Sequence, residues 1–126
     1  MPFVRISLRQ GKPASHRGAI ADGVHRAMVE TIKVPPLDRF QVVTEYDQAG
    51  LIYDPSYLDI PRTDGIVFVQ ITLNAGRTVE MKKALYARIA ELLAADPGVR
   101  KEDVLISLIE VQKENWSFGN GIAQYA

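Results

Sequence analysis

The sequence predicts an α/β domain built from two pseudo-symmetric strand–helix–strand repeats, and three observations lead to this prediction. The length of 126 residues suits one ordinary domain. When the chain is shifted by about 65 positions, it matches itself without a gap over roughly 43 positions. In each half, apolar residues first recur with the period of a strand and then with the period of an amphipathic helix. Two copies of one structural unit are therefore expected.

The internal repeat is clearest at the start of each copy. Residues 3–8 (Phe-Val-Arg-Ile-Ser-Leu) align with residues 68–73 (Phe-Val-Gln-Ile-Thr-Leu), and the same register places Asp38 on Asp103. This register also preserves the alternation of polar and apolar positions. The chain is thus divided into a first repeat at about 2–45, a loop at 46–65, a second repeat at about 66–111 and an aromatic tail at 112–126.

Each repeat is expected to contain two strands separated by a helix. Thr78 is expected to cap the second helix, and prolines follow both helices and end them. A crossover through a helix makes the two strands of a repeat parallel, so the prediction is a four-stranded sheet with both helices on one face. The strands are expected at 3–8, 39–45, 66–73 and 103–111, and the helices at 14–32 and 78–94.

The second face of this sheet has no partner within the chain. Five apolar strand residues cannot all face the helices, namely Phe3, Val43, Phe68, Leu105 and Ile109. Because strands normally bury their apolar faces against another layer, we expect the chain to form an oligomer.

Composition excludes several classes of function. The 15 basic and 15 acidic residues cancel, which argues against a nucleic-acid partner or binding to an anionic membrane. The absence of cysteine excludes disulfides, thiolate metal sites and a cysteine nucleophile. His16 and His25 are too far apart to share metal-ligand spacing, and we expect no metal or cofactor. No apolar run approaches membrane-spanning length and the start lacks a signal-peptide pattern, so a cytoplasmic location is expected.

Pro2 is the first candidate for chemistry. Methionine before a small residue is commonly removed, which would leave Pro2 with a secondary amine at the N-terminus. An ordinary α-amino group has a pKa near ~8, and burial beside cations lowers that pKa. Pro2 would then be a rigidly held base near neutral pH. In the alternative interpretation, Pro2 merely precedes a strand.

Together, these motifs resemble the tautomerase superfamily. The resemblance is carried by the Met-Pro-Phe start, the two repeats, the segment from Val34 to Gln41, the segment Asn74-Ala75-Gly76-Arg77-Thr78, and Trp116-Ser117-Phe118-Gly119. It is strongest to the fused-repeat branch that includes malonate semialdehyde decarboxylase. The resemblance implies a homotrimer that acts without a cofactor on a small oxo acid, with Pro2 as general base or general acid.

The resemblance also implies roles for five further residues. Asp38 assists at the active site, Arg77 binds the substrate carboxylate, Trp116 and Phe118 wall the pocket, and Tyr125 closes it. A first family arginine is replaced here by Asn74 or Ala75, depending on the alignment. With one arginine remaining, keto–enol tautomerisation of a phenylpyruvate-like acid or an unsaturated dicarboxylate is favoured.

Alternatives remain open for the function and for the residues. The chain could decarboxylate or hydrate a 3-oxo acid such as malonate semialdehyde, or be a catalytically silent trimeric binding or structural module. Asp38 could cap a turn, and the aromatic residues of the tail could simply cover the sheet. Arg39 and Arg62 are interpreted as surface or subunit-contact charges, and both histidines as surface or helix-packing residues.

Overall fold

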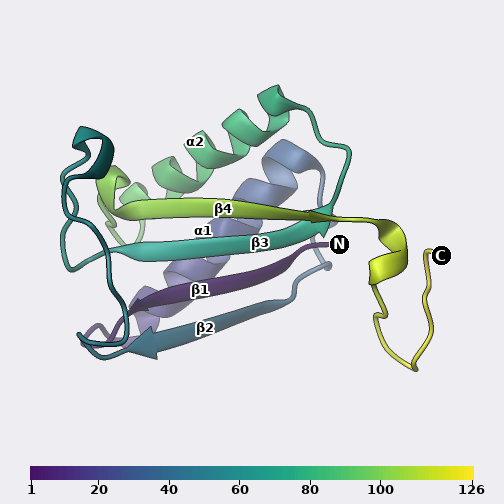
Figure 1. The fold of residues 1–126 in the computed structure, drawn as a ribbon, viewed down its shortest axis with the longest axis horizontal. Helices are drawn as coiled ribbons and strands as arrows, with labels where there is room; N and C mark the ends of the chain where they lie inside the picture. The colour runs from purple at the N-terminus through teal and green to yellow at the C-terminus, as the bar shows by residue number, and fades with distance from the viewer.

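The computed structural model describes residues 1–126 and consists of one four-stranded sheet with two helices behind it (Figure 1). The strand order is β2-β1-β3-β4. The pairs β1–β2 and β3–β4 are parallel, and the central pair β1–β3 is antiparallel. The predicted fold class is confirmed. The elements are β1 (Phe3–Arg9), α1 (Ala14–Ile32), β2 (Gln41–Tyr46), β3 (Val67–Asn74), α2 (Val79–Ala95) and β4 (Val104–Val111).

The helices begin and end for local reasons. The hydroxyl of Thr78 accepts a hydrogen bond from the backbone N–H of Met81 at 3.2 Å, so the predicted cap of α2 is present. Lys33 ends α1 in the left-handed conformation, with φ of 61°. The backbone N–H of Val34 then donates to the carbonyl of Met28 at 3.3 Å, which directs the chain into the turn that leads to β2.

The core lies between the sheet and the helices. Ile6 and Val69 from the central strands are fully buried, as are Ile20 of α1 and Leu85 of α2. Val43 also packs against this core, because its partner in the parallel ladder is Ile6. It therefore lies on the helix side of the sheet, and Val42 is the exposed valine of β2.

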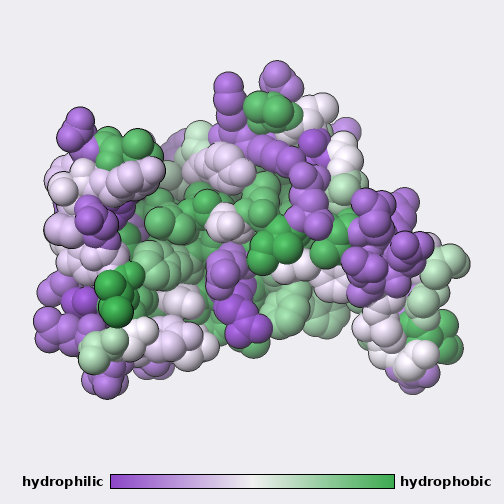
Figure 2. Space-filling model, in the orientation of Figure 1, coloured by the Kyte–Doolittle hydropathy of each residue, from purple (hydrophilic) through white to green (hydrophobic).

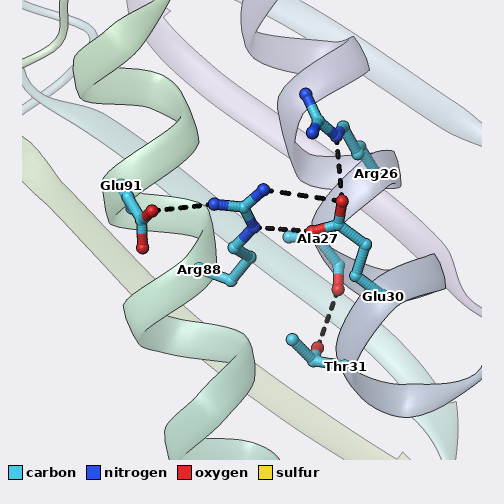
Figure 3. A network of polar contacts seen from close by, with 6 residues as sticks. All are labelled: Arg26, Ala27, Glu30, Thr31, Arg88 and Glu91. Carbon is cyan, nitrogen blue, oxygen red and sulfur yellow. Dashed lines mark hydrogen bonds and ion pairs between the residues drawn. The ribbon is translucent and has the colours of Figure 1, made fainter.

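Gly23 of α1 lies in close contact with Leu93 of α2. A Cβ atom added there would lie 2.8 Å from Cδ2 of the fully buried Leu93. Toward solvent, polar side chains join the helices instead (Figure 3): Arg88 donates to Glu30 at 2.6 Å and to Glu91 at 2.8 Å. The hydrogen bond from Arg88 is the main reason that the pKa of Glu30 is lowered. The two helices are thus joined by a close contact at Gly23 in the interior and by polar side chains toward solvent.

The face of the sheet opposite the helices is open and largely apolar. Figure 2 shows apolar side chains gathered over the strands on this face. Phe3, Leu105 and Ile109 are 38%, 42% and 46% exposed, and Phe68 is half-buried. The expected uncovered face therefore exists, although Val43 is not part of it.

The segments outside the repeats carry only short helical turns, at Tyr57–Asp59 and Lys113–Asn115. The first segment is fastened to the second repeat, because the carboxylate of Asp103 accepts hydrogen bonds from the backbone N–H and hydroxyl of Thr63. Neither main helix has the combination of length and apolar character that crossing a membrane requires.

Candidate active site

Four segments of the chain meet at one edge of the sheet. The strands β1 and β2 begin at this edge, and β3 and β4 end there. Because β1 lies between β2 and β3, Pro2 is flanked by Arg39 on one side and by the segment 74–77 on the other. Figure 1 shows the N-terminus at the same edge as the ends of β3 and β4.

A groove of about 480 Å³ lies at this edge. Pro2, Trp116 and Phe118, three of the predicted site residues, line it together with Arg39 and Phe40. The side chain of Pro2 is buried, whereas that of Phe40 is 55% exposed. The groove therefore joins the start of the chain to its aromatic tail, which are separated by almost the whole sequence.

Asp38 is buried without a hydrogen bond. It is 8% exposed, and neither oxygen of its carboxylate accepts a hydrogen bond. The nearest cation is the amino group of Met1, whose nitrogen lies 3.7 Å from Oδ2. Since the carboxylate accepts no backbone N–H, Asp38 does not cap the turn. A buried carboxylate without hydrogen bonds is costly, and the ion-pair partner of this one is the amino group of Met1.

His25 holds the segment that carries Asp38. Its Nε2 lies 2.8 Å from the carbonyl oxygen of Pro36, and the residue is 9% exposed. This contact ties the turn 35–38 to α1 and confirms the interpretation of His25 as a helix-packing residue.

His16 lies in a separate hollow at the opposite edge of the sheet. Partial burial, with the charges of Lys12 and Arg17, lowers the pKa of His16.

The aromatic residues of the tail form one cluster. Trp116 stacks on Phe118 with 5.4 Å between ring centroids, and Tyr125 meets Phe118 edge to face at 5.4 Å. The indole N–H of Trp116 donates to Oδ1 of Asn74 at 2.7 Å. This bond fastens the tail to the end of β3 and so fixes the aromatic wall. Tyr125 is 52% exposed and supports Phe118 instead of lining the groove.

Arg77 is not among the residues that line the groove. Its side chain is half-buried, and Nη1 donates to the carbonyl of Asn74 at 3.1 Å. Asn74 therefore contacts both Arg77 and Trp116. Asn74 is one of the two positions at which the resemblance implies that an arginine is replaced. In this chain it has a structural role, because it accepts hydrogen bonds from Arg77 and Trp116.

Six of the nine lining residues are absent from the site predicted from the sequence, namely Phe3, Arg39, Phe40, Gln41, Val42 and Ser117. Arg39 is the only lysine or arginine among the nine residues that line the groove. The strand order explains the position of Arg39. Because β1 and β2 are parallel neighbours, Arg39 before β2 lies near Pro2 before β1. The repeat alone does not reveal which strands of the two copies are neighbours.

Known proteins are similar to this chain in sequence and in fold. Two family models, both described as tautomerase enzyme, match residues 38–119 and residues 2–58. The chain is 47% identical over 124 residues to the probable tautomerase YusQ of Bacillus subtilis (strain 168), and the match covers 98% of each chain.

Two solved structures extend the comparison. FG41 malonate semialdehyde decarboxylase, inhibited by 3-bromopropiolate, superposes with a TM-score of 0.92 and 40% identity, covering 98% of this chain and 93% of that one. The wild-type Q0 fused 4-OT, a symmetric trimer, gives a TM-score of 0.79 and 25% identity, covering 95% and 94%. Together with the family models and the curated relative, these matches confirm the resemblance, and the chain belongs to the tautomerase superfamily of enzymes.

Proposed function

We propose that this protein, after loss of Met1, is a cofactor-free tautomerase that uses the amine of Pro2 to interconvert the keto and enol forms of a small oxo acid. The observation that carries the proposal is the position of Asp38, a buried carboxylate without hydrogen bonds whose Oδ2 lies 3.7 Å from the amino group of Met1, the residue whose loss would free the nitrogen of Pro2. Pro2 itself is buried and lines the groove.

The proposed reaction needs one proton carrier. The nitrogen of Pro2 takes a proton from the carbon next to the carbonyl, so that the C–H bond breaks and its electron pair forms the enolate. The same nitrogen then returns the proton to oxygen, which gives the enol; the reverse order regenerates the ketone. The negative charge of Asp38 stabilises the protonated amine between these two steps.

The other site residues bind and shield the acid. Arg77 anchors the carboxylate through a charge-assisted hydrogen bond, which requires its side chain to turn from the carbonyl of Asn74 toward the groove. Trp116 and Phe118 provide an apolar wall against the enol, and Tyr125 keeps Phe118 in place. Exclusion of water by this wall strengthens the contacts between charges within the groove.

We also propose that the working enzyme is a homotrimer. The open apolar face of the sheet needs a cover, and the fused 4-OT of similar fold is a symmetric trimer. Three copies that pack these faces together would bury Leu105 and Ile109 in the centre. Each groove lies at the edge of its sheet and shares Phe3 and Val42 with the open face, so a neighbouring copy would pack beside it.

The experiment that tests the function compares Pro2→Ala with the wild type for enolisation of phenylpyruvate, followed by the absorbance of the enol. Loss of the ring amine should lower kcat by at least about 100-fold, the usual contribution of a general base. Pro13→Ala, which changes the proline before α1 at the opposite edge of the sheet, is the matched control and should retain activity. Equal activity in Pro2→Ala would assign the turnover to another group.

Arg77→Ala separates binding from proton transfer. The variant should mainly raise KM for oxo acids, because Arg77 holds the carboxylate equally in the ground state and the transition state. A ketone without a carboxylate should be turned over equally by the variant and the wild type. A selective loss of kcat for the acids would instead place Arg77 in the chemical step.

A second candidate function is decarboxylation or hydration of a 3-oxo acid such as malonate semialdehyde. The 40% identity to FG41 malonate semialdehyde decarboxylase favours it. Release of CO₂ from malonate semialdehyde, measured beside enol formation from phenylpyruvate, discriminates the two reactions. Rapid CO₂ release with slow enolisation would favour the decarboxylase. Absence of both activities would leave a silent trimeric binding or structural module.

A further inference from the structure

We propose that the hollow at the edge of the sheet opposite the groove is a second binding site, which takes a small carboxylate. The hollow has a volume of about 420 Å³, and Arg9, Lys12 and His16 are among the residues that line it. It lies where β1 and β2 end and β3 begins. The inference concerns a place separate from Pro2 and does not depend on the reaction proposed there.

The repeat builds the loop at this hollow in the same way as the loop at the other edge of the sheet. Residues 9–12 correspond to residues 74–77 in the register of the repeat. In both copies the second residue of the loop donates its backbone N–H, at 2.9 Å, to a carbonyl of the neighbouring parallel strand: Gln10 to Tyr46, and Ala75 to Val111. The two loops therefore leave their strands in the same direction.

The backbone of both loops then turns at a glycine and presents a cation. Gly11 and Gly76 have φ angles of 117° and 124°, which favour glycine. Each is followed by a basic residue, Lys12 in the first copy and Arg77 in the second. Lys12 thus holds at the hollow the position that Arg77 holds in the second repeat.

Lys12 supplies the positive charge of the hollow that has no counter-charge. The other two cations of this region have carboxylate partners: Arg9 pairs with Asp64 at 2.7 Å, and Arg17 pairs with Glu45 at 3.0 Å. Lys12 lines the hollow, is exposed to it and forms no ion pair within the chain. A concave surface with an excess of one charge attracts a ligand of the opposite charge, here an anion.

Arg9 adds a hydrogen-bond donor that the chain does not satisfy. Its terminal nitrogens donate to Asp64 at 2.7 Å and to the carbonyl of Leu51 at 2.9 Å. Its Nε is buried and has no partner, and a buried donor without an acceptor is costly. A carboxylate has two oxygens, so it can accept from the guanidinium and from the ammonium group of Lys12 together.

The hollow lacks the amine of the groove. The register of the repeat places Val67 where the groove has Pro2. Val67 lies within the chain, so its nitrogen belongs to a peptide bond and has no basic lone pair. This copy therefore keeps the cation and has lost the proposed base, which is why we assign binding to it and not the reaction of the groove.

His16 reports on the charge inside the hollow. Partial burial lowers its pKa, and the charges of Lys12 and Arg17 lower it further. A carboxylate bound beside Lys12 would oppose these charges and raise the pKa of His16. The other histidine, His25, contacts the carbonyl of Pro36 away from the hollow, so it is an internal control.

The test follows the imidazole C2–H resonances of both histidines by NMR over a pH titration, with increasing succinate at an ionic strength held constant with sodium chloride. The pKa of His16 should rise with succinate and reach a plateau, while His25 stays unchanged. Succinamide, which has the same skeleton without charge, should leave both histidines unchanged. A wild type in which succinate gives no saturable rise for His16 would overturn the proposal.

Three variants then locate the cation. Lys12→Gln should weaken the apparent affinity for succinate at least about fivefold, the size of one close charge contact at the dielectric of water, and Lys12→Arg should retain it. The matched control is Lys83→Gln, which removes an exposed lysine of α2 and should bind as the wild type does. Equal affinity in Lys12→Gln would overturn the site. Because binding is measured at His16 and turnover at Pro2, failure of this proposal leaves the tautomerase proposal standing.

Discussion

Asp38 and Asp103 hold the same position in the two repeats and have opposite environments. The carboxylate of Asp103 accepts two hydrogen bonds from Thr63 and fastens the segment between the repeats. The carboxylate of Asp38 accepts none, although both residues are buried. The repeat therefore provides an internal comparison: in one copy the aspartate accepts structural hydrogen bonds, and in the other it faces only the amino group of Met1, at 3.7 Å.

This contrast predicts opposite effects of one substitution. Asp38→Asn should lower kcat without loss of thermal stability, because it removes a buried charge that has no hydrogen bonds. Asp103→Asn should retain kcat and lose stability by about 1–3 kcal/mol, because it disturbs satisfied buried hydrogen bonds. Enzyme kinetics and thermal unfolding of both variants check the pair. Loss of stability in Asp38→Asn with normal kcat would make Asp38 a structural residue.

The secondary structure elements could be predicted almost to the residue. The helix expected at 78–94 is Val79–Ala95, and the strand expected at 39–45 is Gln41–Tyr46. Apolar spacing and the Thr78 cap act locally, so the sequence contains them directly. Order between the strands of different repeats depends on long-range packing. The sequence alone therefore does not show that Arg39, an exposed charge as expected, also lines the groove, or that Val43 lies on the helix side of the sheet.

At the scale of one element, the glycines of α1 give a sharp test of the packing between helices. Gly18→Ala should raise stability by roughly 0.5–1 kcal/mol, because nothing lies within 4 Å of the added methyl group. Gly23→Ala should lower stability by about 1–3 kcal/mol, because the methyl group would lie 2.8 Å from Leu93. Thermal unfolding distinguishes them. A stabilised Gly23→Ala would show that the helices separate easily.

For the whole molecule, the open apolar face of the sheet is the surface through which copies of the chain are proposed to assemble. The alternation along the strands predicted an uncovered apolar face, but a single chain cannot reveal how many copies cover it. The proposed trimer is consistent with the exposed Phe3, Leu105 and Ile109. The groove is lined within one chain by Pro2, the start of β2 and the tail, and it shares Phe3 with the open face.

Ile109→Lys tests the proposed assembly. A charge placed at the centre of an apolar contact should convert the trimer into smaller species, measured by light scattering during size-exclusion chromatography. Tyr86→Lys, which adds the same charge to an exposed aromatic residue of α2, should leave the trimer intact. A trimeric Ile109→Lys protein would mean that the copies meet through another surface.

The central claim is that the free amine of Pro2 performs the proton transfer, and the intact mass of the purified, active protein tests it most directly. The account predicts the mass of a chain that begins at Pro2. A protein that retains Met1 carries an amide at Pro2, which has no basic nitrogen. Full turnover by a preparation whose mass includes the methionine would contradict the account.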